Sequence, residues 1–135
     1  MLSTTQRDKL RAAFHKDALR VRSVSPDGQV HWKRVMDAQR AEVGSESIWE
    51  ARTEQGPLVL TGGHRVYLTP TTKTEMENLQ EEQHVLGVTD SEVGSPTIRS
   101  VQKIENRQFM YDLTAEDWHN FVLHRSGVVV SNSPD

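Results

Sequence analysis

Short segments of alternating apolar and polar residues, separated by turn residues, run through most of this sequence. The clearest is 98–104, where Ile98 and Ile104 share one side of the alternation and Val101 lies on the other. A period of two is typical of a half-buried strand, whereas a helical pattern is expected only in 4–18, where Leu10 and Phe14 fall on one side. Further strands are expected at 19–24, 29–36, 47–53, 58–61, 66–68, 85–88, 108–113, 121–123 and 128–130. The sequence therefore predicts an all-β domain with one N-terminal helix.

Turn residues indicate how some of these strands connect. The segment 25–28 reads Ser-Pro-Asp-Gly, which favours a tight turn and predicts a hairpin between 19–24 and 29–36. A short helical turn is expected within 75–83, and the polar segment 89–97, rich in Gly, Ser and Pro, is expected to be a loop.

Composition excludes several classes of function. The 135 residues fit one domain, and 16 Lys and Arg against 19 Asp and Glu give a net charge of -3. That balance does not favour nucleic acid as a partner, and no apolar run is long enough to cross a membrane. The sequence has no cysteine, which excludes disulfides, thiolate-bound zinc and a thiol nucleophile from this chain. Its six His form neither an H-E-x-x-H pattern nor a tight cluster, so neither a metal nor another cofactor is expected.

The segment that follows the last expected strand is chemically informative. The apolar residues 128–130 precede Asn132 and Ser133. An Asn side-chain amide that is held against its own backbone carbonyl can attack it, forming a succinimide and cleaving the chain, if nearby groups handle the protons. The Ser133 hydroxyl is placed to accept an acyl group. The alternative is an ordinary polar tail, since Asn-Ser is a common turn dipeptide.

Two motifs resemble those of inteins, the self-excising domains that splice proteins. The C-terminal splicing motif is matched by Tyr111–Thr114, Glu116–Asp117, His119–Phe121, Gly127–Val130 and Asn132–Ser133. The intein motif in which two residues separate Thr from His is matched by Thr61–His64, which reads TGGH. The resemblance extends over 19–133, and it implies the horseshoe-shaped all-β hedgehog/intein (Hint) fold.

The resemblance also implies roles for individual residues. His64, with Thr61 beside it, would polarise and protonate the upstream scissile peptide bond, and Ser133 would receive the acyl chain as a branched ester. Asn132 would then cyclise, with His119 and Asp117 tuning the proton transfers. For each histidine, a structural role with satisfied hydrogen bonds is the alternative.

One residue departs from the family pattern next to the reacting asparagine. Inteins usually carry His at this penultimate position, which is Ser131 here. Because serine carries no positive charge, cyclisation is expected to depend more on His119, or on His124 if the fold brings it close.

The first residues of the sequence also depart from the pattern. Residues 1–7 do not match the opening motif of inteins, which begins with a Cys or Ser nucleophile, and Ser3 is only a weak alternative for that nucleophile. A separate short N-terminal intein fragment is therefore expected to supply the first nucleophile and the missing strands. Residues 1–18 would be a helical extension at the split site, 19–132 the intein C-terminal fragment, and 133–135 a stub of the C-extein.

The resemblance therefore predicts a split mini-intein that performs protein trans-splicing in a single turnover, in the cytoplasm of a prokaryotic or phage-encoded system. The segment 69–98 is too short for a homing endonuclease. The expected partners are the N-terminal fragment and the flanking exteins, and the isolated chain is expected to be partly disordered or prone to associate. Two alternatives stay open: an autoprocessing domain that cleaves without ligating, and an inactive interaction module.

Overall fold

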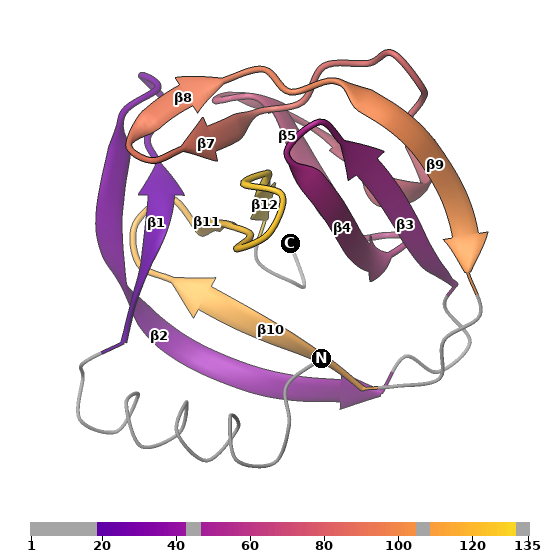
Figure 1. The fold of residues 1–135 in the computed structure, drawn as a ribbon. Coiled ribbons are helices and arrows are strands. Elements are labelled where there is room, and N and C mark those ends of the chain that lie inside the picture. The colour runs from indigo at the N-terminus through magenta and orange to yellow at the C-terminus, as the bar shows by residue number, and fades with distance from the viewer. Residues whose placement is uncertain (1–18, 43–46, 105–108, 132–135) are drawn as a thin grey trace.

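The computed structural model describes residues 19–42, 47–104 and 109–131, and these ranges consist almost entirely of strands (Figure 1). The strands are β1 (Arg20–Val24), β2 (Val30–Glu42), β3 (Ile48–Thr53), β4 (Gly56–Thr61), β5 (Arg65–Thr69), β6 (Thr72–Glu75), β7 (Gly87–Thr89), β8 (Glu92–Gly94), β9 (Ile98–Ile104), β10 (Phe109–Ala115), β11 (Asn120–Val122) and β12 (Val129–Ser131). Within these ranges the one helical element is the 3-10 turn η1 (Met76–Asn78). No helix there is long and apolar enough to span a membrane.

The long strand β2 pairs with a different strand along each of its halves. Its first half pairs antiparallel with β1, from Val24 opposite Val30 to Arg20 opposite Arg34. Its second half pairs antiparallel with β10, beginning with Val35 opposite Ala115. The order β1-β2-β10 therefore joins the start of the described chain to a strand from near its end.

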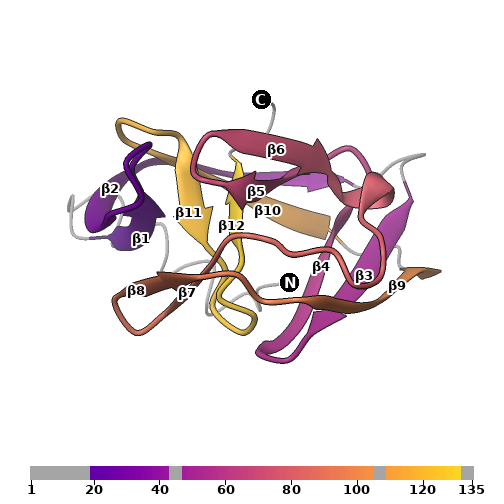
Figure 2. The same ribbon diagram turned by 90° about the horizontal axis from the view of Figure 1, so that it is seen from above.

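Three further sheets complete the fold, with strand orders β11-β12-β5-β6, β4-β3-β9 and β7-β8. In Figure 1, β11 and β12 lie in the middle of the view, with β2 and β10 below them, β7 and β8 above and β3, β4 and β9 at the right. The perpendicular view places β5 and β6 next to β12 (Figure 2). The strand that carries Ser131 is thus surrounded by the rest of the domain.

The core lies on both faces of β12. Val130 belongs to a cluster with Leu58, Val66 and Ile98, whereas Val129 belongs to a second cluster whose other buried members are Val24, Tyr67, Leu86 and Val88. Neighbouring residues of a strand point to opposite faces, so a strand buried on both sides carries a continuous apolar run. The run of three valines at 128–130, each 0% exposed, has this cause.

Most of the predicted all-β fold is confirmed. The hairpin of β1 and β2 and the strands β3, β4, β5, β9, β10, β11 and β12 lie where alternation predicts strands. One expectation is wrong, because the predicted loop 89–97 contains β8. The short helical turn predicted within 75–83 is present as η1. The strand β6 was also missed. The predicted helix 4–18 lies outside the described residues.

Gly127, in the turn before β12, occupies a position where a larger residue would be strained. Its φ is +72°, and a Cβ there would lie 2.5 Å from the Val88 carbonyl oxygen. We expect Gly127→Ala to lower the free energy of unfolding by about 1–3 kcal/mol, the cost of left-handed backbone strain before any clash is relaxed. Urea denaturation measures the change. The matched control is Gly94→Ala, because nothing lies within 4 Å of a Cβ at that position. Equal effects of the two substitutions would contradict the prediction.

Candidate functional site

The two sequence motifs meet at a single buried contact. His64 Nε2 lies 2.6 Å from the carbonyl oxygen of Ser131, although 67 positions separate the two residues in sequence. A carbonyl oxygen only accepts hydrogen bonds, so Nε2 carries the proton in this contact. His64 is 9% exposed and Ser131 is 1% exposed. The candidate site is therefore centred on the peptide group that precedes Asn132.

A tight turn between β4 and β5 places His64 at this position. The His64 N–H donates to the Thr61 carbonyl at 3.1 Å, which closes the TGGH turn. A Cβ at Gly62 would lie 2.5 Å from Glu77 Oε2, at the end of an exposed side chain, and 3.0 Å from Trp49 Nε1, so both side chains would have to shift to admit a larger residue. Thr61 itself is half-buried at the end of β4, where it pairs with Ile48 of β3. Thr61 and His64 thus share one turn, as the motif predicts.

Ser131 is held by groups from two other strands and from the TGGH turn. It lies opposite Asn120 in the antiparallel pairing of β11 and β12, and its carbonyl accepts the bond from His64 just before β5. Its hydroxyl oxygen lies 3.4 Å from Nζ of Lys73 on β6. A basic side chain that the sequence analysis did not identify therefore contacts the penultimate residue.

Asn120 anchors β11 to β1 through its side chain. Its Oδ1 accepts hydrogen bonds from Ser23 Oγ at 2.6 Å and from the Val24 N–H at 2.9 Å, and its Nδ2 donates to the Val24 carbonyl at 2.9 Å. The residue is 2% exposed. A buried amide with these bonds fixes the position of β11, and hence of its partner Ser131.

Asp117 and His119 lie in the connection between β10 and β11. Both have left-handed backbone conformations, with φ of 66° and 54°. The Asp117 carboxylate lies 2.5 Å from Lys33 Nζ on β2, and Lys33 also lies 4.6 Å from the centre of the Trp118 ring. The Asp117 side chain is 54% exposed, so this ion pair contributes little to stability. His119 is exposed and makes no hydrogen bond to the described residues, although it directly precedes Asn120.

Other predicted residues do not join this cluster. His124 lies in the turn between β11 and β12, at the opposite end of that hairpin from Ser131, so the fold does not bring it close to Ser131. Asn132 and Ser133 lie outside the described residues. Among residues 19–42, 47–104 and 109–131, no three His, Asp or Glu side chains gather in a way that could hold a metal ion.

Comparison with solved structures identifies the fold as the Hint fold of inteins. The chain superimposes on a DnaB intein from Synechocystis sp. PCC 6803 with a TM-score of 0.72 and 18% identity, covering 92% of this chain and 85% of that one. For the transcription factor IIB Mvu mini-intein the TM-score is 0.72 at 19% identity, with coverages of 84% and 71%. For the VidaL intein it is 0.69 at 16% identity, with coverages of 96% and 82%. The sequence matches no protein-family model and no curated relative.

Proposed function

We propose that this chain is the C-terminal fragment of a split intein and performs protein trans-splicing. The partner's first nucleophile, Cys or Ser, shifts the upstream peptide bond to an ester or thioester, and Ser133 takes over the acyl chain. Asn132 then cyclises, which breaks the bond to Ser133 and releases the exteins joined through an ester. The freed Ser133 amine attacks this ester, which forms the new peptide bond and regenerates the Ser133 hydroxyl. Two peptide bonds are broken and one is formed, and the reaction needs no oxidant or energy source.

The observation that carries this proposal is the contact between His64 and Ser131. The first motif would serve the upstream junction and the second the downstream junction, and splicing requires both junctions to react at one place. A bond of 2.6 Å between the two motifs supports this arrangement. This bond places an imidazole N–H against the carbonyl of the peptide group that precedes Asn132.

We further propose that His119 serves the cyclisation of Asn132 in the assembled site. Asn120 lies opposite Ser131 in the structure, and His119 and Asn132 are the neighbours in sequence of this pair. His119 would then be available for proton transfer at the cyclising amide. Asp117, in the same connection, contacts Lys33 of β2 and would tune the charge near His119.

A separate N-terminal fragment is supported by the sequence and by open sheet edges. Residues 1–7 do not match the opening motif of inteins. Among the described strands, β4 and β9 each pair with β3 alone, which leaves backbone groups that a further strand could pair with. We propose that the short partner fragment supplies such strands together with the first nucleophile.

The decisive experiment fuses a reporter after Ser133 and mixes the chain with candidate short N-terminal fragments that carry an N-extein. Intact-mass analysis should detect a ligated product and a chain shortened by the reporter that ends in a succinimide. A chain that folds and binds a fragment without any mass change would contradict splicing and favour the inactive interaction module. Release of the reporter without ligation would favour the autoprocessing domain.

We expect His64→Ala to slow both the upstream acyl shift and the downstream release, each by at least about tenfold. The upstream effect follows from loss of the acid, and the downstream effect follows because the buried Ser131 carbonyl loses its donor. Single-turnover rates of the two cleavages, separated by mass, test this. His31→Ala is the control. His31 is exposed on β2, and its ring lies against Trp118 rather than against Ser131. A downstream rate that His64→Ala leaves unchanged would restrict His64 to the upstream junction.

A further inference from the structure

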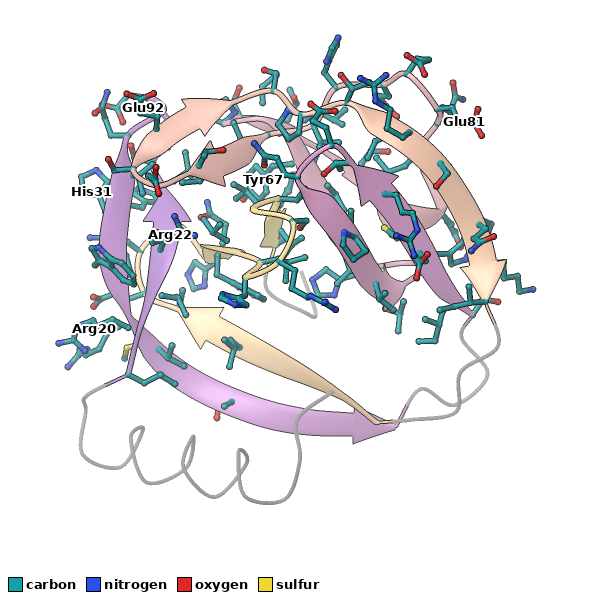
Figure 3. All side chains as sticks on the ribbon, viewed as in Figure 1. Arg20, Arg22, His31, Tyr67, Glu81 and Glu92 are labelled. Atoms are coloured by element: carbon teal, nitrogen blue, oxygen red, sulfur yellow. The ribbon has the colours of Figure 1, made fainter. Side chains whose placement is uncertain are left out.

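The side chain of Lys73 crosses one strand to reach the penultimate residue. Lys73 lies on β6 opposite Tyr67 of β5, and β5 separates β6 from β12 in the sheet. Its ammonium group lies 5.5 Å from the centre of the Tyr67 ring and 3.4 Å from Ser131 Oγ. Tyr67, labelled in Figure 3, is 7% exposed and belongs to the same core cluster as Val129. Its ring therefore gives the lysine stem a fixed surface to lie on.

Ser131 is positioned to transmit this charge to its neighbour. Its side chain is buried at 1% exposure, and its backbone is held by Asn120 and His64. A hydroxyl whose oxygen accepts a bond from an ammonium group still has its own proton to donate. Bonds in such a chain polarise one another, so the Ser131 proton becomes a stronger donor.

We propose that Lys73, acting through the Ser131 hydroxyl, supplies the positive charge that inteins usually obtain from a penultimate histidine. The proposal rests on the proposed splicing function. In the assisted step a bond forms between Asn132 Nδ2 and the Asn132 carbonyl carbon, and the bond from that carbon to the Ser133 nitrogen breaks. One proton leaves the side-chain amide and one reaches the departing amine. The pair of Lys73 and Ser131 stabilises the negative charge that develops on the attacked oxygen. Lys73 is thus a positioning residue rather than a proton carrier.

The position of Lys73 explains why a residue on β6 supplies the positive charge. The side chain at position 131 is enclosed by β11, by β5 and by His64 of the TGGH turn, and serine fits there with 1% exposure. A longer side chain anchored two strands away can deliver a charge to this point while its stem stays at the surface. Lys73 is exposed as a residue, so its replacement does not remove core packing.

The test is a double-mutant cycle on the rate of reporter release in the mixed, reconstituted protein. Lys73→Met and Ser131→Ala should each slow release by about 10- to 100-fold, somewhat less than removal of a direct oxyanion donor. The double variant should be no slower than the slower single variant, because the two residues act in series. Lys73→Arg should restore most of the rate. Arg52→Met should have no effect, because Arg52 is exposed on β3, which already has a paired strand on each side.

The outcomes separate this inference from the proposed function. If the wild-type pair releases and ligates while Lys73→Met keeps the wild-type rate, the role of Lys73 is overturned and splicing stands. Effects of Lys73→Met and Ser131→Ala that multiply in the double variant would overturn the relay through the hydroxyl. A wild-type chain that folds, binds its partner and releases nothing overturns both proposals. Equal melting temperatures of wild type and Lys73→Met would exclude a merely structural effect.

Discussion

Replacing Asn132 with alanine should reduce release of the reporter by at least about 1,000-fold, since in the proposed mechanism the Asn132 amide is the group that attacks the scissile carbonyl. The earlier steps do not use this amide, so the branched ester should accumulate. Its mass equals the sum of the C-terminal chain with its reporter and the transferred N-extein. Intact-mass analysis over the reaction time measures both species.

The control for this variant is Asn78→Ala, because Asn78 is exposed in η1. It should splice at the wild-type rate. Mild alkali or hydroxylamine should cleave the species accumulated by Asn132→Ala, as expected for an ester. Normal reporter release from Asn132→Ala would show that another group cleaves this junction and would exclude asparagine cyclisation.

Replacing Asn120 with alanine should lower the free energy of unfolding by about 4 kcal/mol. The substitution leaves the N–H and the carbonyl of Val24 without the bonds that the amide provides, and each unsatisfied buried group costs about 1–3 kcal/mol. It also removes the acceptor 2.6 Å from Ser23 Oγ, although that hydroxyl keeps its bond to the Asn120 backbone carbonyl. Urea denaturation monitored by far-UV circular dichroism measures the loss.

Two comparisons make this prediction specific. Asn78→Ala should change stability by less than about 0.5 kcal/mol, as is usual for an exposed site. Ser23→Ala should cost less than Asn120→Ala, because Val24 keeps both of its bonds to the amide. If Asn120→Ala were no more destabilising than Ser23→Ala, the amide would not be what joins β11 to β1.

The sequence predicts strands well where one or both faces are buried. In β4 the buried Leu58 and Leu60 alternate with half-buried residues, and β12 lies in an unbroken valine run, so burial leaves a pattern in each. The missed strands lack this signal: β6 reads TKTE with two exposed residues, and every residue of β8 is exposed. Backbone pairing alone holds these short strands, and backbone pairing leaves no trace in side-chain chemistry.

Only those residues of the candidate site that belong to a sequence motif could be predicted. The spacing of Thr61 and His64 identifies the turn, but nothing in the sequence indicates that His64 reaches the carbonyl of a residue 67 positions away. Lys73 was missed for a related reason. Its contact with Ser131 depends on the order of strands β12, β5 and β6, and a lysine in a polar strand looks like any solvated residue.

The bond network of Asn120 has a consequence for synthesis on the ribosome. It joins residues 97 positions apart, so the hairpin of β1 and β2 cannot complete its packing until β11 has been made. At about 5–20 residues per second, that wait is roughly 5–20 seconds. Contacts this distant in sequence also slow folding itself, because a long loop must close before they stabilise anything. The nascent chain therefore carries unpaired strand edges for seconds. The contact between His64 and Ser131 is among the last to form, because Ser131 is made late. In the proposed mechanism, no splicing reaction can start before the hairpin of β11 and β12 has emerged from the ribosome.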